Sequence, residues 1–195
     1  MRSLARLLSL PPMLALVLLA PLALAALARP AAAQQAAQPR KLGQFQSWTA
    51  ATLVDGGHKV CYIFARASKA EGVVNRAPTH VLLTVTHRAA GRDAVALRVG
   101  YTYPRTTDGR DPVRVSVGTT EFPFYTSQDT AFTRENGNVV RALRAGRDAV
   151  ARGPGPNNRG TATDTFPLAG FAQAYDLISR ECPPGAATDA APARR

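Results

Sequence analysis

Three observations predict an all-β fold, a β-sandwich or barrel, with one short helix and a C-terminal helix. Short segments of alternating apolar and polar residues recur, and turn-forming residues separate them at intervals of roughly 8–12 residues. Two later segments instead place apolar residues at helical spacing. The chain has 195 residues, and removal of a predicted leader of 33 leaves 195 − 33 = 162, a length that suits one domain with its own core.

Residues 1–33 are predicted to be a secretory signal peptide. Two arginines and no acid precede a long apolar run, which ends in small residues at Ala33. Cleavage is expected after Ala33, with Ala28 as the alternative. Three prolines interrupt the run, which disfavours the other alternative, a leader retained as a membrane anchor. We therefore expect a periplasmic protein, with surface association or secretion as alternatives, and no integral membrane span after cleavage.

Alternation, or enrichment in β-branched and aromatic residues, predicts the strands. The turn cluster Asp55-Gly56-Gly57-His58 indicates a hairpin between the first two strands, and Gly118 indicates another turn. The strands are expected over 45–52, 59–65, 79–87, 95–101, 113–117, 122–124, 131–134, 149–152 and 161–166.

Two segments show helical spacing instead. The first is a short helix over 137–145, and the second is an amphipathic helix that ends near Cys182, where two prolines follow. Composition biased toward Ala, Gln and Pro predicts a disordered lead-in over 34–43, and an Ala-rich segment predicts a disordered tail over 183–195. The folded domain is therefore expected to span 44–182.

The chain contains two cysteines, Cys61 and Cys182. In an oxidising compartment an even, isolated pair is most simply one disulfide. Neither has a second Cys or a His at ligand spacing, so metal and redox roles are not expected. The bond would tie the C-terminal segment to an early strand. It would close a loop of about 120 residues, for which the chain-entropy model gives about 5 kcal/mol.

The charge of the chain is strongly positive. Lys and Arg number 24 against 13 Asp and Glu, and the leader holds three arginines and no acid, so the net charge without it is +11 − 3 = +8. This charge favours an anionic envelope component or a host-surface partner. The basic residues are scattered, which is also typical of an ordinary solvated surface. Export and the lack of a recognition motif argue against nucleic acid as a partner. No oligomeric state is predicted.

The sequence contains no familiar catalytic pattern. It has neither a Gly-x-Ser-x-Gly elbow nor a phosphate-cradling glycine loop. The histidines His58, His80 and His87 are expected at the surface, with His80 and His87 on opposite faces of one strand, which argues against a metal-ligand pair. Asp108 and Asp111 fit turn chemistry. We therefore expect no enzyme activity, no catalytic residue, no metal and no cofactor.

The most suggestive polar residues lie near the C-terminal end of the domain: Arg159, Gly160, Thr161 and Asp164. A loop arginine and an aspartate could bind a ligand, which would make the protein a periplasmic ligand-binding protein or an enzyme. Such residues more often satisfy backbone groups or one another, and the structural role is therefore favoured.

Aromatic residues follow strand periodicity along the chain. They are expected to pack in the core rather than to form a platform on which sugars stack. These residues are Trp48, Tyr62, Phe64, Tyr101, Phe122 and Phe124.

Several ordered segments between residues 45 and 182 carry a family resemblance. They are Phe45 with Trp48, Lys-Val-Cys-Tyr-Ile at 59–63, Leu-Thr-Val-Thr-His-Arg at 83–88, Val-Gly-Tyr at 99–101, Ala-Leu-Arg-Ala-Gly at 142–146, Asn-Arg-Gly-Thr at 158–161 and Asp-Thr-Phe-Pro-Leu-Ala-Gly-Phe at 164–171. With the leader, this set resembles the invasion-associated locus B family of exported proteobacterial proteins. Pro167 and Phe132 depart from the serine and tryptophan that the family often has there.

The resemblance implies an immunoglobulin-like β-sandwich and a non-enzymatic role in the envelope, with no catalytic residues to carry over. The family is named for promoting invasion of host cells. We therefore expect an exported, non-enzymatic envelope or surface protein that acts by binding, in envelope maintenance or in host-cell invasion. The alternative is a ligand-binding protein or enzyme with a site near Arg159, Thr161 and Asp164.

Overall fold

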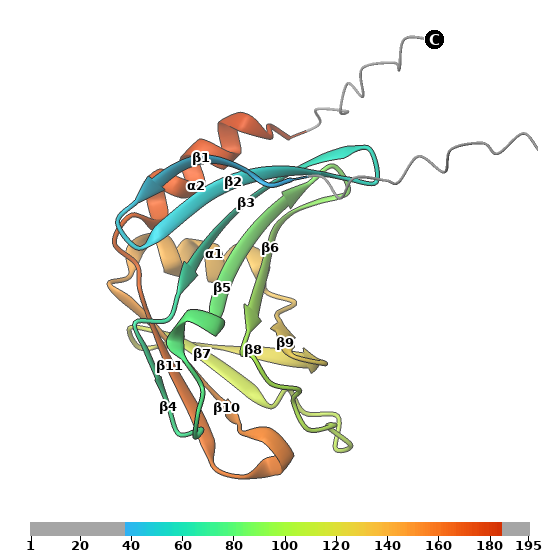
Figure 1. Ribbon diagram of the computed structural model, residues 1–195, viewed down its shortest axis with the longest axis vertical. Coiled ribbons are helices and arrows are strands. Elements are labelled where there is room, and N and C mark those ends of the chain that lie inside the picture. The colour runs from blue at the N-terminus through green and yellow to red at the C-terminus, as the bar shows by residue number, and fades with distance from the viewer. Residues whose placement is uncertain (1–37, 185–195) are drawn as a thin grey trace, which may run out of the picture. The chain divides into compact units, whose positions relative to one another are not determined.

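The computed structural model describes residues 38–184 (Figure 1). The predicted signal peptide, residues 34–37 of the predicted lead-in and residues 185–195 of the predicted tail lie outside the described residues. Within residues 38–184, no helix combines the length and the apolar character that crossing a membrane requires.

All strand pairs of the domain are antiparallel. The strands are β1 (Arg40–Phe45), β2 (Trp48–Asp55), β3 (His58–Arg66), β4 (Lys69–Glu71), β5 (Leu82–Arg88), β6 (Gly91–Arg98), β7 (Val113–Val117), β8 (Thr120–Ser127), β9 (Thr130–Phe132), β10 (Asp148–Pro154) and β11 (Thr161–Pro167). The helices are α1 (Asn136–Ala145) and α2 (Phe171–Glu181), with 3₁₀ turns η1 (Pro78–His80) and η2 (Pro156–Asn158).

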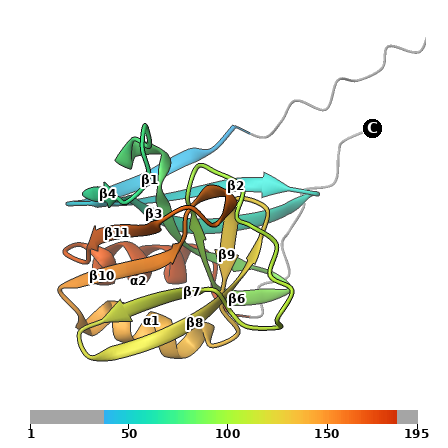
Figure 2. The ribbon, with the colours of Figure 1, turned by 90° about the horizontal axis from the view of Figure 1, so that it is seen from below.

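The strands join in the order β1-β2-β3-β5-β6-β9-β8-β7-β10-β11-β4, and this continuous sheet folds over at β8. Residues 120–124 of β8 pair with β7, whereas residues 125–127 pair with β9. We call the layer from β1 to β9 the first sheet and the layer from β7 to β4 the second sheet (Figure 2). Two antiparallel layers share one core, so the predicted all-β, immunoglobulin-like β-sandwich with one short helix and a C-terminal helix is confirmed.

Both helices pack on the first sheet (Figure 1). α2 packs on β1, β2 and β3, and α1 packs on β6. Trp48 meets Phe171 edge to face, with ring centroids 4.8 Å apart, and its Nε1 donates to Pro167 O at 3.0 Å. The helices bury one apolar face each, as their spacing predicts. The buried residues are Val139, Val140 and Leu143 in α1 and Phe171, Ala174 and Ile178 in α2.

The C-terminal end of α2 is fastened to the first sheet. Cys182 forms a disulfide with Cys61 of β3, as predicted. Lys59 Nζ donates to Glu181 Oε1 at 2.6 Å and to Glu181 O at 3.2 Å, and Arg92 Nη1 donates to Cys182 O. Cationic donors at the last carbonyls satisfy acceptors that a helix end leaves free and complement its dipole. The covalent bond and the cap therefore fix the same end of the helix.

The disordered lead-in predicted over 34–43 is wrong for residues 40–43, because they belong to β1 and pair with β2. Leu42 and Phe45 pack against the core, and Arg40 forms an ion pair with Glu181 at 3.1 Å. The predicted strand 45–52 likewise contains the β1–β2 turn, where Gln46 has a φ of 48°. Packing against α2, at the other end of the sequence, orders a segment whose own composition favours disorder.

Candidate functional site

The four polar residues singled out in the sequence fall in two environments. β11 buries alternate side chains, and Asp164 is among those that face the core, only 2% exposed. Thr161 faces solvent at the start of the same strand. Arg159 and Gly160 lie exposed in the connection between β10 and β11. The structure therefore separates Asp164 from the other three.

Asp164 pairs with Arg76, which sequence reasoning did not single out. The guanidinium meets the carboxylate through two hydrogen bonds, Nη1 to Oδ2 at 2.9 Å and Nη2 to Oδ1 at 2.5 Å. The Arg76 and Asp164 side chains are 4% and 2% exposed. The guanidinium also lies over the ring of Tyr101, 5.5 Å from its centroid, and Tyr101 Oη donates to Pro154 O at 2.8 Å. This is a bidentate ion pair inside the core.

Burial dominates the electrostatics of this cluster. It raises the pKa of Asp164, while the Arg76 guanidinium acts in the opposite direction. Burial also raises the pKa of Tyr101 to about 12 and raises that of the neighbouring Tyr103 further. Arg76 Nε is buried without a partner among the described residues. Neither tyrosine is poised to exchange a proton near neutral pH, and the carboxylate is occupied by its arginine.

A close backbone contact holds the loop that carries Arg76. Gly72 has a φ of 80°, and a Cβ at this position would lie 1.8 Å from Thr161 O. Only glycine fits both the left-handed conformation and the contact. Gly72 thus packs on the start of β11, and the Gly160–Thr161 segment helps to position the loop that carries Arg76.

Gly160 and Thr161 also line a surface groove of about 610 Å³. We call it the basic groove. Its lining residues come mainly from the loop 104–112 and from β10 and the β10–β11 connection. These segments lie at the lower end of the domain in Figure 1. Its charged lining residues are Arg105, Arg110, Arg114, Arg152, Asp108 and Asp111. Neither Arg76 nor Asp164 lines it, so the buried ion pair and the groove are distinct.

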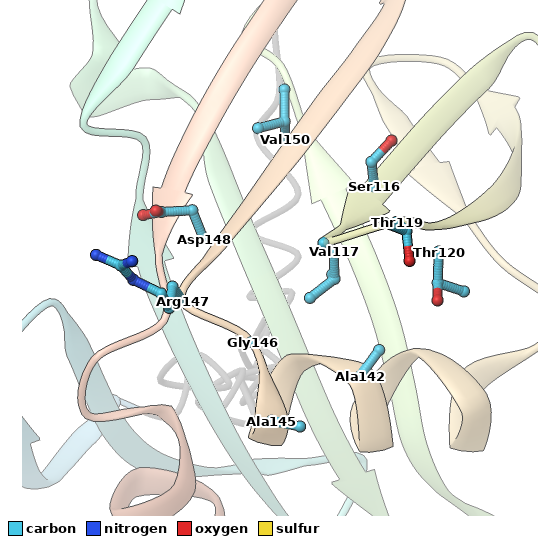
Figure 3. Close-up of a pocket in the computed structure, with 11 residues that line it drawn as sticks. Ser116, Val117, Thr119, Thr120, Ala142, Ala145, Gly146, Arg147, Asp148 and Val150 are labelled. Atoms are coloured by element: carbon cyan, nitrogen blue, oxygen red, sulfur yellow. The ribbon is translucent and has the colours of Figure 1, made fainter.

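A second hollow of about 640 Å³ lies between the β7–β8 turn and the C-terminal end of α1 (Figure 3). Small apolar side chains and hydroxyl groups line most of it, with Arg147 and Asp148 as its only charged lining residues. A Cβ on Gly146 would lie 2.3 Å from Val117 Cγ1, so the helix end packs tightly against β7. These residues form no nucleophile–base pair and no group of metal ligands.

His87 is buried, which corrects its predicted place at the surface. Its Nε2 lies 3.1 Å from Ser179 Oγ, and its Nδ1 lies 3.6 Å from Asp93 Oδ1. The arrangement has the composition of a Ser-His-Asp triad, but the hydrogen bonds oppose that role. The backbone N–H of Asp93 donates to Nδ1 at 3.3 Å, which leaves the proton on Nε2. The imidazole therefore donates to Ser179 and cannot take its proton.

The His87 cluster joins α2 to the first sheet. Tyr175 Oη donates to Asp93 Oδ1 at 2.6 Å, and the Tyr175 ring packs edge to face on His87 with centroids 5.3 Å apart. His80 is not on the same strand, because the chain forms the turn η1 there and β5 begins only at Leu82. The predicted opposite-face arrangement of the two histidines is therefore wrong.

Acid should destabilise the protein through His87. Burial and the charge of Arg92 lower its pKa below the usual 6.5, so the unfolded state binds the proton more tightly. We expect the free energy of unfolding to fall as the pH drops below about 6.5. Urea denaturation between about pH 8 and pH 5 measures it. His87→Gln, which retains a donor and an acceptor, should flatten this pH dependence; an unchanged profile would assign it to other groups.

Tyr62 and Phe64 lie on the outer face of the first sheet, so their predicted place in the core is wrong. Cys61 and Ile63 face the core, so Tyr62 and Phe64 face outward, half-buried, with ring centroids 6.2 Å apart. Trp48, Phe122 and Phe124 are in the core as predicted, and Tyr101 packs against it. Side chains alternate along β3 as the sequence predicts, but the alternation alone does not say which of the two faces is covered.

The described residues contain no group of three or more His, Cys, Asp or Glu side chains that could hold a metal ion. No protein-family model matches this sequence, and no curated protein sequence matches it either. Among solved structures, the domain is similar to the crystal structure of invasion associated protein B from Bartonella henselae, with a TM-score of 0.51. The similarity covers 71% of this chain and 96% of that chain at 18% sequence identity. At this identity the likeness shows a shared fold.

Proposed function

We propose that this protein is an exported, non-enzymatic protein of the bacterial envelope, of the invasion-associated locus B type, which acts by binding. The Cys61–Cys182 disulfide carries the proposal, because such a bond persists in an oxidising compartment. It agrees with the export signal predicted over residues 1–33. The shared fold with invasion associated protein B and the ordered segments between residues 45 and 182 support the family.

The polar clusters of the domain support binding rather than catalysis. Asp164 is held by Arg76 inside the core, and His87 has the wrong tautomer to activate Ser179. Each cluster holds together elements that are distant in sequence, and this contribution to the fold accounts for its polar groups. The basic groove offers arginines and hydroxyl groups on an open surface, which suits recognition of an anionic ligand.

Localisation and loss of function test the proposal together. The cleaved protein should appear in the periplasmic or surface fraction, and both cysteines should resist a thiol-alkylating reagent until the protein is reduced. A strain lacking the gene should lose envelope integrity, measured as leakage of a periplasmic enzyme under detergent stress. Cytoplasmic protein with free thiols, or a normal envelope in the deletion strain together with normal host-cell attachment, would contradict the proposal.

A role in host-cell invasion is the second candidate. The observation that favours it is the likeness to a protein that is itself described as invasion associated. Attachment and entry assays with the deletion strain separate the two roles. A defect in entry with an intact envelope supports invasion, whereas a leaky envelope with normal entry supports maintenance.

A further inference from the structure

Two arginines directly oppose each other on the outer face of the second sheet. Arg114 of β7 and Arg152 of β10 are paired across the strands, and both are exposed. Side chains at such positions lie close together, and like charges there destabilise a sheet. The pair therefore costs stability in the isolated domain, and a bound anion would remove that cost.

The lining of the basic groove carries a net positive charge. Four arginines and two aspartates line the basic groove, a net charge of +4 − 2 = +2. Both aspartates are already engaged. Asp108 accepts from the backbone N–H of Arg110 at 3.1 Å and lies 3.6 Å from its Nε. Asp111 receives two hydrogen bonds from Arg134, at 3.0 and 3.1 Å.

Two of the groove arginines are available, and a third is held in place. Within residues 38–184, neither Arg105 nor Arg152 forms an ion pair with its side chain. Arg114 Nη1 donates to Asp111 O at 3.0 Å, and Arg114 Nε lies 3.3 Å from Glu121 Oε1. A guanidinium fixed in this way loses less conformational freedom when an anion binds.

We infer that the basic groove binds an anionic glycan through its phosphate or sulfate groups. This rests on the proposed function, because it names the ligand class of an envelope binding protein. Guanidinium groups match tetrahedral oxyanions by paired hydrogen bonds. Thr106, Thr107 and Asn158 line the same groove and offer partners for sugar hydroxyls. Its volume of about 610 Å³ lies within the usual range for small-ligand sites, roughly 300–1,000 Å³.

The groove fits a glycan better than the surface of a bilayer. Interfacial membrane binding needs apolar side chains that enter the acyl boundary. The large apolar residues that the described domain exposes are Val54, Val74 and Tyr125, and none of them lines the groove. Recognition at this site therefore depends on the polar and charged groups of the ligand.

Calorimetric titration of the folded, oxidised protein at physiological ionic strength tests the inference. Three probes are used: a sulfated heparin oligosaccharide of defined size, a phosphorylated, deacylated lipopolysaccharide, and uncharged dextran.

The variant Arg105→Gln/Arg152→Gln should bind the anionic probe about tenfold or more weakly. The control Arg141→Gln/Arg180→Gln changes exposed arginines of the two helices and lowers the net charge equally. It should stay within about twofold of the natural protein.

Each result bears on the groove in a defined way. Binding of heparin alone indicates a sulfated host-type glycan, and binding of lipopolysaccharide indicates a phosphorylated envelope glycan; either supports the site. Binding of neither, equal binding of dextran, or an equal loss in the control variant overturns it. Arg152→Gln alone should raise the thermal midpoint while it weakens binding. Failure here leaves the localisation and deletion results untouched, so it is distinguishable from failure of the proposed function.

Discussion

Removal of the Cys61–Cys182 disulfide should lower the free energy of unfolding by about 2–5 kcal/mol. The bond spans 121 residues, so it restricts nearly the whole unfolded domain, and it holds the end of α2 on β3. The variant Cys61→Ala/Cys182→Ala tests this by urea denaturation. Alanine is preferable to serine at position 61, because Cys61 is fully buried and an added hydroxyl would need a partner.

Reduction of the natural protein provides the control for this experiment. Dithiothreitol should produce a loss similar to that of the double variant, and it should leave the double variant itself unchanged. Equal urea midpoints for the oxidised protein and the double variant would show that the bond contributes nothing.

Breaking the buried ion pair should cost about as much, roughly 3–5 kcal/mol for Asp164→Ala. The substitution leaves the Arg76 guanidinium in the core without its carboxylate, where its Nε already lacks a partner. Much of the loss is therefore the cost of an uncompensated charge. Chemical denaturation of Asp164→Ala, Arg76→Met and Arg76→Met/Asp164→Leu separates these contributions.

The double variant should recover most of the stability, because two apolar side chains of similar size need no partner. An exposed pair provides the matched control. Arg88 and Asp55 lie 2.7 Å apart, but their side chains are 52% and 58% exposed. Asp55→Ala should cost about 1 kcal/mol or less. If Asp164→Ala cost no more than this, the pair would have no special role.

Patterns along the chain predicted both helices and most of the strands, because alternation and helical spacing are local properties, but they missed β1 and β4. The disulfide was predictable from the number of cysteines and the expected compartment. Whether a given strand side chain faces the core or the solvent was harder to predict. The same alternation fits His87 inside or outside, and only the position of α2 decides that it is covered. The prediction for Tyr62 is wrong for the converse reason, because neither α1 nor α2 covers the outer face of β3.

The candidate site was only partly predictable, because its members come from distant segments. Asp164 and Thr161 were singled out from one short stretch, but alternation along β11 sends them to opposite sides. Arg76 is 88 residues from its partner, and no local pattern marks it. Arg114 and Arg152 meet only through the pairing of β7 with β10, which a single sequence does not reveal.

An ion pair between Arg40 and Glu181 joins the two ends of the described domain. It brings the first strand and the end of the last helix together at the upper end of the domain in Figure 1, while the loop 104–112 and the β10–β11 connection lie at the lower end. Anything joined to either end of the domain, whether an affinity tag or a surface linker, is therefore attached away from the basic groove. A protein held at Arg40 or Glu181 would therefore present the groove to a ligand in solution.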